Sequence, residues 1–200
     1  MKITHKNINI TINLLMVILE IIGFVLVFKE LGIASLEYYT EDSNLLLMIS
    51  SIILLIYISK NKEQPSWFKS FRYIAIVSTT LTLIIVLTVL TGTTDFGLYY
   101  LLFHESMLYH HTLCPVLAVL SFIFVERYDN LQTIHGIYFT AIYGIIMISL
   151  NALKIVEGPY PFLLVHNQPI IHSIIWTVLI FAITYVIALI LKKVNGKVII

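Results

Sequence analysis

Apolar residues recur along the chain in six long stretches that short polar segments separate. The stretches cover residues 8–28, 44–59, 73–90, 106–125, 136–153 and 170–191. Because a helix needs about 20 mostly apolar residues to cross the hydrocarbon core of a bilayer, each stretch predicts one membrane-spanning helix. The strands of a membrane barrel would alternate apolar and polar residues over about 10 positions, and these unbroken stretches do not. The pattern therefore predicts an all-α bundle of six transmembrane helices.

Composition agrees with this interpretation. Hydrophobic residues make up 59% of the chain and its mean hydropathy is +0.95, whereas a soluble domain is roughly half apolar. The polar segments between the predicted spans are too short to form a folded soluble domain. We therefore expect residues 1–200 to form a single integral membrane domain. The basic and then apolar start resembles a signal peptide, but its apolar run exceeds the usual 7–15 residues, roughly, and no small-residue cleavage site follows. We expect a retained first span.

Basic residues divide unevenly between the two sides of the predicted bundle. If the chain crosses the membrane at every span, one side carries ten of the twelve Lys and Arg residues, and the other carries only Lys29 and Lys154. By the positive-inside rule, the ten mark the cytoplasmic side, which also holds both termini. We therefore interpret them as topology signals of a multi-pass protein of the cell membrane and expect no nucleic-acid partner.

Hydroxyl, imidazole, carboxylate and aromatic side chains gather on the opposite, outer side. They occur within residues 37–44, 94–115 and 157–172. Thr40 precedes the second apolar stretch, and His111 lies about 8 Å into the fourth by the helical rise of ~1.5 Å per residue. An ionisable side chain at that depth should face the bundle interior or a wet cavity. Since a threonine hydroxyl needs a base to become a nucleophile and histidine suits that task, Thr40 and His111 have the chemistry for acyl transfer.

Structural roles compete with this hypothesis. Thr40, Asp42 and Ser43 are residue types that cap the start of a helix with their side-chain oxygens. An interior histidine such as His111 is often a hydrogen-bonded packing residue. Pro115 should kink the fourth helix because it frees the carbonyl group of residue 111. Glu20, inside the first span, serves either in an interhelical hydrogen bond or near the site.

The histidines of the fourth span and of the segment before it are candidate metal ligands. His104 and His111 share a helix face but stand about 10 Å apart along it, and His110 and His111 point about 100° apart. Neither spacing suits one ion, whose ligand nitrogens lie at about 2.0–2.1 Å. Cys114 is the only cysteine, which excludes an internal disulfide and a multi-cysteine metal site. We expect neither metal nor cofactor, and only a zinc site assembled with the histidines near the sixth span stays open.

Three motifs in order resemble those of a known family. Residues 39–46 read YTEDSNLL, residues 111–115 read HTLCP and residues 159–162 read PYPF. They are similar to the "Y/F-T-x-x-S-N-L" stretch, the histidine-and-proline motif of span four and the "Y-P-Y-P-F" loop of the androgen-induced-gene and ADTRP-like family, in its bacterial six-span branch. The resemblance extends over the whole chain in the number and order of spans.

The resemblance implies an activity, because eukaryotic members are threonine hydrolases that cleave fatty acid esters of hydroxy fatty acids. It implies that Thr40 is the nucleophile and His111 the base, with the adjacent His110 as the alternative base. The residues implied to bind substrate or support the site are Tyr39, Ser43, Asn44, His110, Pro115, Tyr160 and Phe162. The implied substrate is a membrane lipid or fatty acyl ester, and the implied location is a bacterial plasma membrane.

Further details of this hypothesis concern the surroundings of the pair. Backbone amides at the start of span two, Ser43 or Asn44 are the expected oxyanion donors. Glu41, Asp42 and Glu105 are candidates for a third catalytic member, and Tyr38, Tyr39, Tyr160 and Phe162 are expected to form an aromatic rim at the headgroup level. The competing hypothesis is a transporter or binding protein for a lipid or small molecule, although the internal repeats and interrupted helices of transporters are not evident.

Overall fold

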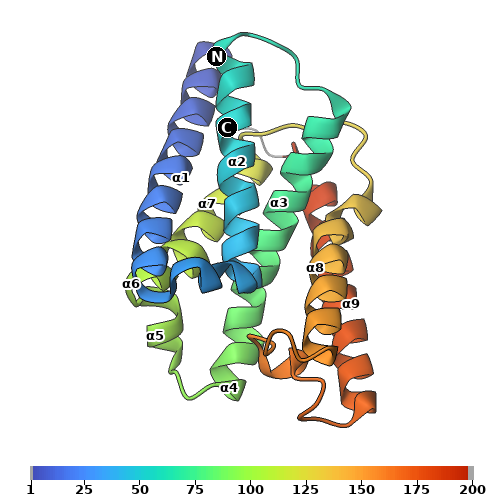
Figure 1. The fold of residues 1–200 in the computed structure, drawn as a ribbon. Coiled ribbons are helices and arrows are strands. Elements are labelled where there is room, and N and C mark those ends of the chain that lie inside the picture. The colour runs from blue at the N-terminus through green and yellow to red at the C-terminus, as the bar shows by residue number, and fades with distance from the viewer. Residues whose placement is uncertain (1, 198–200) are drawn as a thin grey trace.

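The computed structural model describes residues 2–197, and this part of the chain is helical with no β-strand (Figure 1). Six helices within it are long and apolar enough to cross a membrane. They are His5–Glu37, Tyr39–Ser59, Ser66–Thr93, Glu105–Phe124, Thr133–Ala152 and Ile170–Val194. The predicted all-α class and the six predicted spans are thus confirmed. Several of these helices are longer than the predicted stretches because the prediction followed apolar residues alone, whereas the first helix, for example, continues through Lys29 and Glu30.

Several of the six spans are composite. The first joins α1 (Lys2–Leu31) to the 3₁₀ turn η1 (Gly32–Glu37), and the second is α2 (Tyr39–Ser59). The third joins α3 (Ser66–Ile85), the π-helical turn η2 (Val86–Leu90) and α4 (Thr91–Thr93). The short α5 (Leu98–Phe103) precedes the fourth, made of α6 (Glu105–Met107), the π-helical turn η3 (Leu108–Leu113) and α7 (Cys114–Phe124). The fifth joins η4 (Thr133–Ile137) to α8 (Tyr138–Ala152), and η5 (Pro161–Leu163) precedes α9 (Ile170–Val194).

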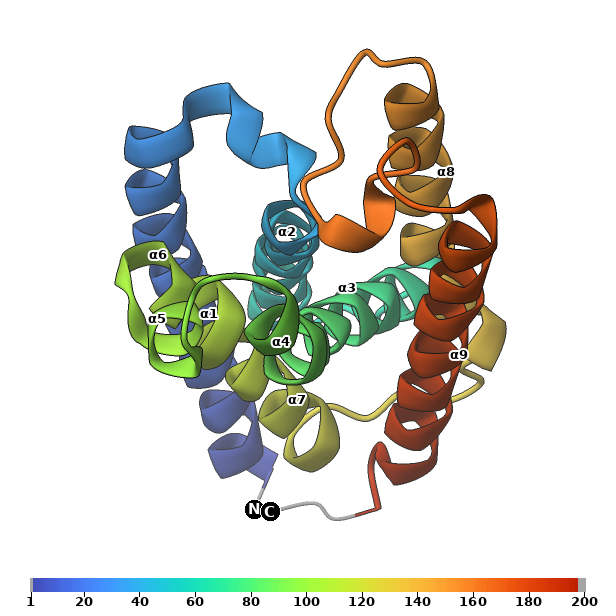
Figure 2. The same ribbon diagram turned by 90° about the horizontal axis from the view of Figure 1, so that it is seen from below.

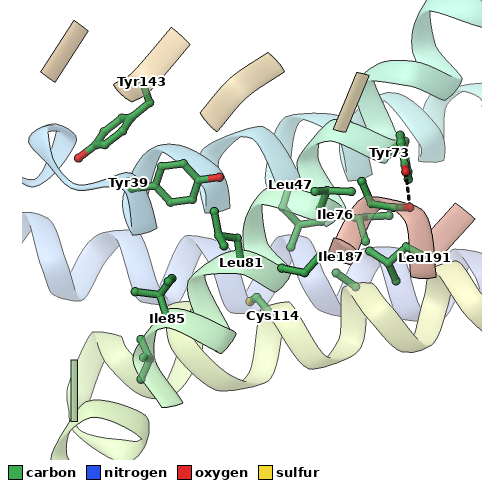
Figure 3. Close-up of a cluster of buried hydrophobic side chains, with 14 of the residues drawn as sticks. Tyr39, Leu47, Tyr73, Ile76, Leu81, Ile85, Cys114, Tyr143, Ile187 and Leu191 are labelled. Carbon is green, nitrogen blue, oxygen red and sulfur yellow. Dashed lines mark hydrogen bonds between the residues drawn. The ribbon is translucent and has the colours of Figure 1, made fainter. Parts of the chain in front are cut away.

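Helix α3 is the centre of the bundle. It contacts α2, α7, α8 and α9, and Figure 2 shows α1 on one side of the bundle and α9 on the other. Its buried residues Ile76 and Leu81 pack with Leu47 of α2 and Ile187 of α9 in the main hydrophobic cluster (Figure 3). The Tyr73 hydroxyl donates to the backbone oxygen of Ala188 and thereby joins α3 to α9. The core therefore lies along α3, between helices distant in sequence.

The two ends of the bundle differ in what they carry. The start of α1 and the end of α9 lie at one end, with the loops after α2 and α7, whereas α4, α5, η1 and η5 lie at the other (Figure 1). Apolar side chains remain exposed along the outside of the bundle, for example Ile145 on α8 and Val178 on α9. Since exposed apolar surface of this extent is costly in water, these faces indicate contact with lipid. Together these features indicate a multi-pass membrane protein.

Arg72, one of the ten basic residues interpreted above as topology signals, is instead a buried structural residue. It lies in the second turn of α3, fully buried, and its guanidinium donates to both carboxylate oxygens of Glu126 at 2.7 and 3.0 Å. It also donates to Ser50 and Ser51 of α2 and to Asn13 of α1. Arg72 thus connects α1, α2 and α3 to the segment that follows α7.

The partner carboxylate is stabilised in its charged form. Burial raises the pKa of Glu126, but the Arg72 guanidinium and hydrogen bonds from Tyr128 and Ser121 outweigh burial, so the pKa stays below the usual value. Burial and the neighbouring Glu126 charge raise the pKa of Tyr128, whose hydroxyl therefore keeps its proton and donates it. A buried ion pair of this kind is costly to break but can be replaced by neutral residues.

Candidate active site

Thr40 lies in the first turn of α2 and does not cap it. The helix begins at Tyr39, and the cap residue is Tyr38, which has an extended backbone and no side-chain cap hydrogen bond. Thr40 instead points its hydroxyl at side chains of other segments, within the bundle. The proposed capping role of Thr40, Asp42 and Ser43 was therefore wrong.

His111 occupies the π-helical turn η3, immediately before Pro115. Proline has no amide hydrogen, so the α-helical bond to the carbonyl group of His111 cannot form. The helix adapts by widening, and the amide of Cys114 donates to the carbonyl oxygen of Tyr109. The sequence predicted a kink at Pro115, and the structure has a π-helical turn immediately before it, a feature that often marks functional sites.

Contacts with the end of α5 orient the His111 ring. The last carbonyl groups of a helix lack partners within it, and here His111 Nδ1 lies 2.6 Å from the Leu101 oxygen. Thr112 binds the next carbonyl group, that of Leu102, at 2.8 Å. Because a carbonyl group only accepts, Nδ1 of His111 must carry the hydrogen. Nε2 of the neutral ring is then an acceptor.

The free nitrogen of His111 faces Thr40. Its Nε2 atom lies 3.5 Å from Thr40 Oγ1, the outer limit of a hydrogen bond, and both residues are buried. The two residues that the sequence paired by their chemistry thus lie side by side, and the catalytic role of the pair stays a prediction. Sequence reasoning missed the Leu101 carbonyl group because a backbone acceptor leaves no mark in residue identity.

Tyr160 completes the immediate surroundings of Thr40. Its hydroxyl lies 3.4 Å from Thr40 Oγ1 and accepts the Thr40 backbone N–H at 3.3 Å. Burial raises the pKa of Tyr160, so the hydroxyl is neutral and has a proton to donate. The ring stacks on Phe162 with a centroid separation of 5.2 Å, and Phe162 in turn packs on Trp176 of α9. The loop before α9 therefore reaches Thr40.

Ser43 and Asn44 support the backbone around the pair. Ser43 Oγ donates to the Thr40 carbonyl group at 2.9 Å, and Asn44 Nδ2 donates to the same group at 2.8 Å. Asn44 Nδ2 also donates to the carbonyl group of His110 at 3.0 Å. Asn44 thus ties the first turn of α2 to the histidine turn. Because both side chains donate to backbone oxygens, neither is the oxyanion donor that the sequence suggested.

An apolar pocket of about 320 Å³ lies beside Thr40. Its lining residues come from α2, α3, η2, α8, η5 and α9, and they include Thr40, Tyr160 and Phe162 but not His111. Thr40 therefore stands between the base and the pocket. Most of the lining is aliphatic or aromatic, and Ile145 of the lining is 68% exposed on the outer surface of α8. Such a volume is within the range of small-molecule sites, roughly 300–1,000 Å³.

The expected aromatic rim is only partly formed. Tyr39 and Tyr160 are buried, and the Tyr39 hydroxyl is 2.8 Å from Thr140 Oγ1 on α8. Tyr39 also packs edge-on against Tyr143. These residues belong to the interior because α8 and the loop before α9 cover them. Tyr39 and Tyr160 therefore do not form an exposed rim, and the expected headgroup level of the four aromatic residues stays a prediction.

The two ring nitrogens of His110 contact Glu20 of α1 and Glu41 of α2 rather than the Thr40 hydroxyl. The Nδ1 atom lies 2.6 Å from a carboxylate oxygen of Glu41, and the Nε2 atom lies 3.3 Å from one of Glu20. The geometry therefore favours His111 over His110 as the base. Within residues 2–197, none of the candidate carboxylates Glu41, Asp42 and Glu105 hydrogen-bonds to His111.

The remaining histidines do not form a metal site in the described part of the chain. No three His, Cys, Asp or Glu side chains of residues 2–197 form a group that could hold a metal ion. His104 stacks on Tyr100, and His166 lies 3.2 Å from the carbonyl oxygens of Asn151 and Ala152.

Comparisons of the chain with protein-family models, curated proteins and solved structures find no match.

Proposed function

We propose that the protein is an intramembrane hydrolase of fatty acyl esters, with Thr40 as nucleophile and His111 as general base. One observation carries the proposal: His111 Nε2, left as an acceptor by the Nδ1 contact with Leu101, faces the Thr40 hydroxyl at 3.5 Å beside an apolar pocket. General-base contacts are often long before a substrate binds, so this distance suits the role.

The first half of the reaction forms an acyl-threonine. His111 Nε2 takes the hydroxyl proton while Thr40 Oγ1 attacks the ester carbonyl carbon. The negative charge on the carbonyl oxygen is stabilised by the Tyr160 hydroxyl and by amide groups of the first turn of α2, which lack helical acceptors. When the carbon–oxygen bond to the alcohol breaks, His111 returns the proton to the departing alcohol oxygen.

Water completes the second half. His111 takes a proton from water, the resulting hydroxide attacks the acyl carbon, and the Thr40 oxygen leaves with the proton from His111. The products are a carboxylic acid and free Thr40. The Leu101 carbonyl group supports both halves because it holds Nδ1–H and stabilises the imidazolium ion that forms twice.

The pocket supports an acyl substrate. Its aliphatic and aromatic walls match a hydrocarbon chain, and the exposure of Ile145 supports entry from the surrounding lipid between helices. Thr40 and Tyr160 then supply the polar end, where an ester carbonyl group would lie. The proposed substrate is therefore a membrane lipid or fatty acyl ester.

The proposed topology has both termini in the cytoplasm, in a bacterial plasma membrane. Nine basic residues other than the buried Arg72 still lie on the side of the termini, which supports this orientation. A Cys114→Ala background with one cysteine at Glu63 or at Glu157, both exposed, provides the test. An impermeant thiol reagent added to intact cells should label position 157 and spare position 63, and the reverse result contradicts the orientation.

A fluorophosphonate probe on the purified protein tests the activity. Thr40→Val keeps the shape of the side chain, and His111→Gln keeps hydrogen-bonding capacity without a base. Both should abolish labelling and lower ester hydrolysis at least about 100-fold while the protein stays folded. Thr40→Ser should retain labelling.

The same pocket also favours the second candidate, a lipid-binding protein without catalysis. Tight binding of a fatty acyl ester, without probe labelling of the parent protein and without hydrolysis, would establish that candidate instead.

A further inference from the structure

A second polar cluster lies beside the proposed active site, and the proposed reaction does not use it. It comprises Glu20 of α1, Glu41 of α2 and His110 of η3, with side chains 0%, 8% and 1% exposed. His110 lies between the two carboxylates, at 2.6 Å from Glu41 and 3.3 Å from Glu20. The cluster thus joins three segments that are far apart in sequence.

Within residues 2–197, the polar atoms on the Glu41 side of the cluster have hydrogen-bond partners, whereas those on the Glu20 side do not. Glu41 and His110 Nδ1 form a short contact, whereas neither carboxylate oxygen of Glu20 nor His110 Nε2 has a hydrogen-bond partner in the described part of the chain. Such orphaned polar atoms are rare inside proteins. An ionisable residue of this kind within a membrane span indicates a functional site.

Charge balance restricts the protonation of the cluster. His110 is the only basic side chain that pairs with Glu20 or Glu41 in residues 2–197, since buried Arg72 already pairs with Glu126. If His110 is charged and both carboxylates are ionised, one negative charge stays uncompensated in an apolar interior. That arrangement is strongly disfavoured, because a buried charge needs a partner.

We propose that Glu20, His110 and Glu41 form a buried proton-binding site in which an ion pair of His110 and Glu41 lies beside a protonated, neutral Glu20. In this state the cluster is neutral as a whole. The Nε2–H group of His110 then faces a neutral carboxyl group, which explains why that contact is looser than the contact with Glu41.

The packing around His110 suits a proton site of fixed geometry. Phe24 covers one side of the imidazole, with ring centroids 4.7 Å apart, and Gly23 leaves room for the ring where any side chain would collide with it. In the described part of the chain, the other titratable groups around the cluster are Asp42 on α2, His111 on η3, Cys114 on α7 and Tyr160 in the loop before α9.

The proton site is placed to act on His111, the next residue in the chain. This consequence rests on the proposed function. When Glu20 releases its proton, the cluster gains a negative charge that stabilises an imidazolium ion at His111, and Thr40 becomes easier to deprotonate. Rates of probe labelling should therefore rise with pH in two steps, one for His111 and one for Glu20.

Infrared spectroscopy of the protein in lipid nanodiscs at neutral pH tests the proton site without any activity. The carbonyl stretch of a buried neutral carboxyl group should be present in the parent and lost in Glu20→Gln. His110→Gln should add a second such band, because Glu41 then has no cation. Glu30→Gln, an exposed site on the same helix, is the matched control and should leave the spectrum unchanged.

The outcomes separate the two proposals. Identical spectra for the parent and Glu20→Gln would overturn the protonated Glu20, and no added band in His110→Gln would overturn the ion pair. If a variant does not fold, nitrogen-15 spectra of the histidine-labelled parent still decide, since His110 must be protonated on both ring nitrogens. Loss of the second pH step in Glu20→Gln supports the link to His111. An inactive parent with the expected infrared bands would contradict the hydrolase alone.

Discussion

A side chain on Gly23 would collide with the ring of His110, because a Cβ atom at position 23 would lie 2.2 Å from His110 Nε2. The clash involves a ring that Glu41 and Phe24 already hold in place. We therefore expect Gly23→Ala to displace His110 and to lower the free energy of unfolding by about 1–3 kcal/mol, the usual cost of overpacking. Thermal unfolding in detergent measures this loss.

The control for this variant is Gly92→Ala. A Cβ atom at position 92, which is also helical, meets nothing within 4 Å. Alanine favours a helix over glycine by about 1 kcal/mol, so Gly92→Ala should be neutral or slightly stabilising. Equal losses in both variants would show that the space beside His110 has no particular importance.

Tyr160→Phe tests the proposed oxyanion donor. The hydroxyl lies 3.4 Å from Thr40 Oγ1, where charge develops on the attacked carbonyl group. Removing one such donor lowers kcat by roughly 100- to 1,000-fold in other hydrolases, and we expect a loss of that order with little change in KM. Steady-state kinetics with a fatty acyl ester measure both constants.

Tyr73→Phe is the matched control for Tyr160→Phe. It also removes a buried tyrosine hydroxyl, but that hydroxyl donates to the Ala188 carbonyl oxygen of α9, and Tyr73 does not line the pocket. It should reduce stability by about 1 kcal/mol and leave kcat within a few-fold of the parent. A comparable fall of kcat in both variants would mean that Tyr160 acts through the fold.

The spans were predictable because lipid imposes a strong pattern on sequence. Length and hydropathy locate each helix, and the sequence also brought together Thr40 and His111 as a chemical pair. The Leu101 carbonyl group was not predictable, since it arises where a short helix ends beside a π-helical turn. The pocket was not predictable either, because apolar residues that line it look like those that fill a core.

Charged residues near the helix ends misled the sequence analysis in a consistent way. Arg72 looks like a basic loop residue until Glu126, 54 positions later, is seen to bind it in the interior. Glu41 was a candidate third catalytic member, but in the structure its carboxylate contacts His110 and not His111. In both cases the partner lies far away in sequence, and only the packing of helices reveals it.

The Arg72–Glu126 pair should be needed for stability but replaceable as a unit. Arg72→Met leaves Glu126 buried without a cation and should cost about 3–5 kcal/mol of unfolding free energy. The double variant with Glu126→Gln removes both charges and should recover most of this loss. Thermal unfolding of the single and double variants provides the comparison, and a double variant as unstable as Arg72→Met would contradict it.

The same pair predicts a pH dependence of stability. The pKa of Glu126 is lower in the folded protein than in the unfolded chain, where it is about 4.3. Its contribution to stability is therefore complete above that value and is lost as the pH falls towards the folded pKa. The parent should lose stability below about pH 4 more steeply than the double variant. Parallel curves for the two proteins would show that Glu126 has no part in acid unfolding.

Gly144→Phe tests whether the pocket holds the acyl chain. Gly144 lines the pocket, and a Cβ atom there meets nothing within 4 Å, so a larger side chain has space to enter. Each methylene group excluded from an apolar site loses about 0.8 kcal/mol, so excluding two lowers kcat/KM for a long-chain ester by roughly 15-fold. A short-chain ester that does not reach residue 144 should react as before. Ile142→Phe is the control, because Ile142 is 57% exposed on the same helix and is not part of the lining. If Gly144→Phe lowered the rates for short and long esters equally, the pocket would not be the acyl site.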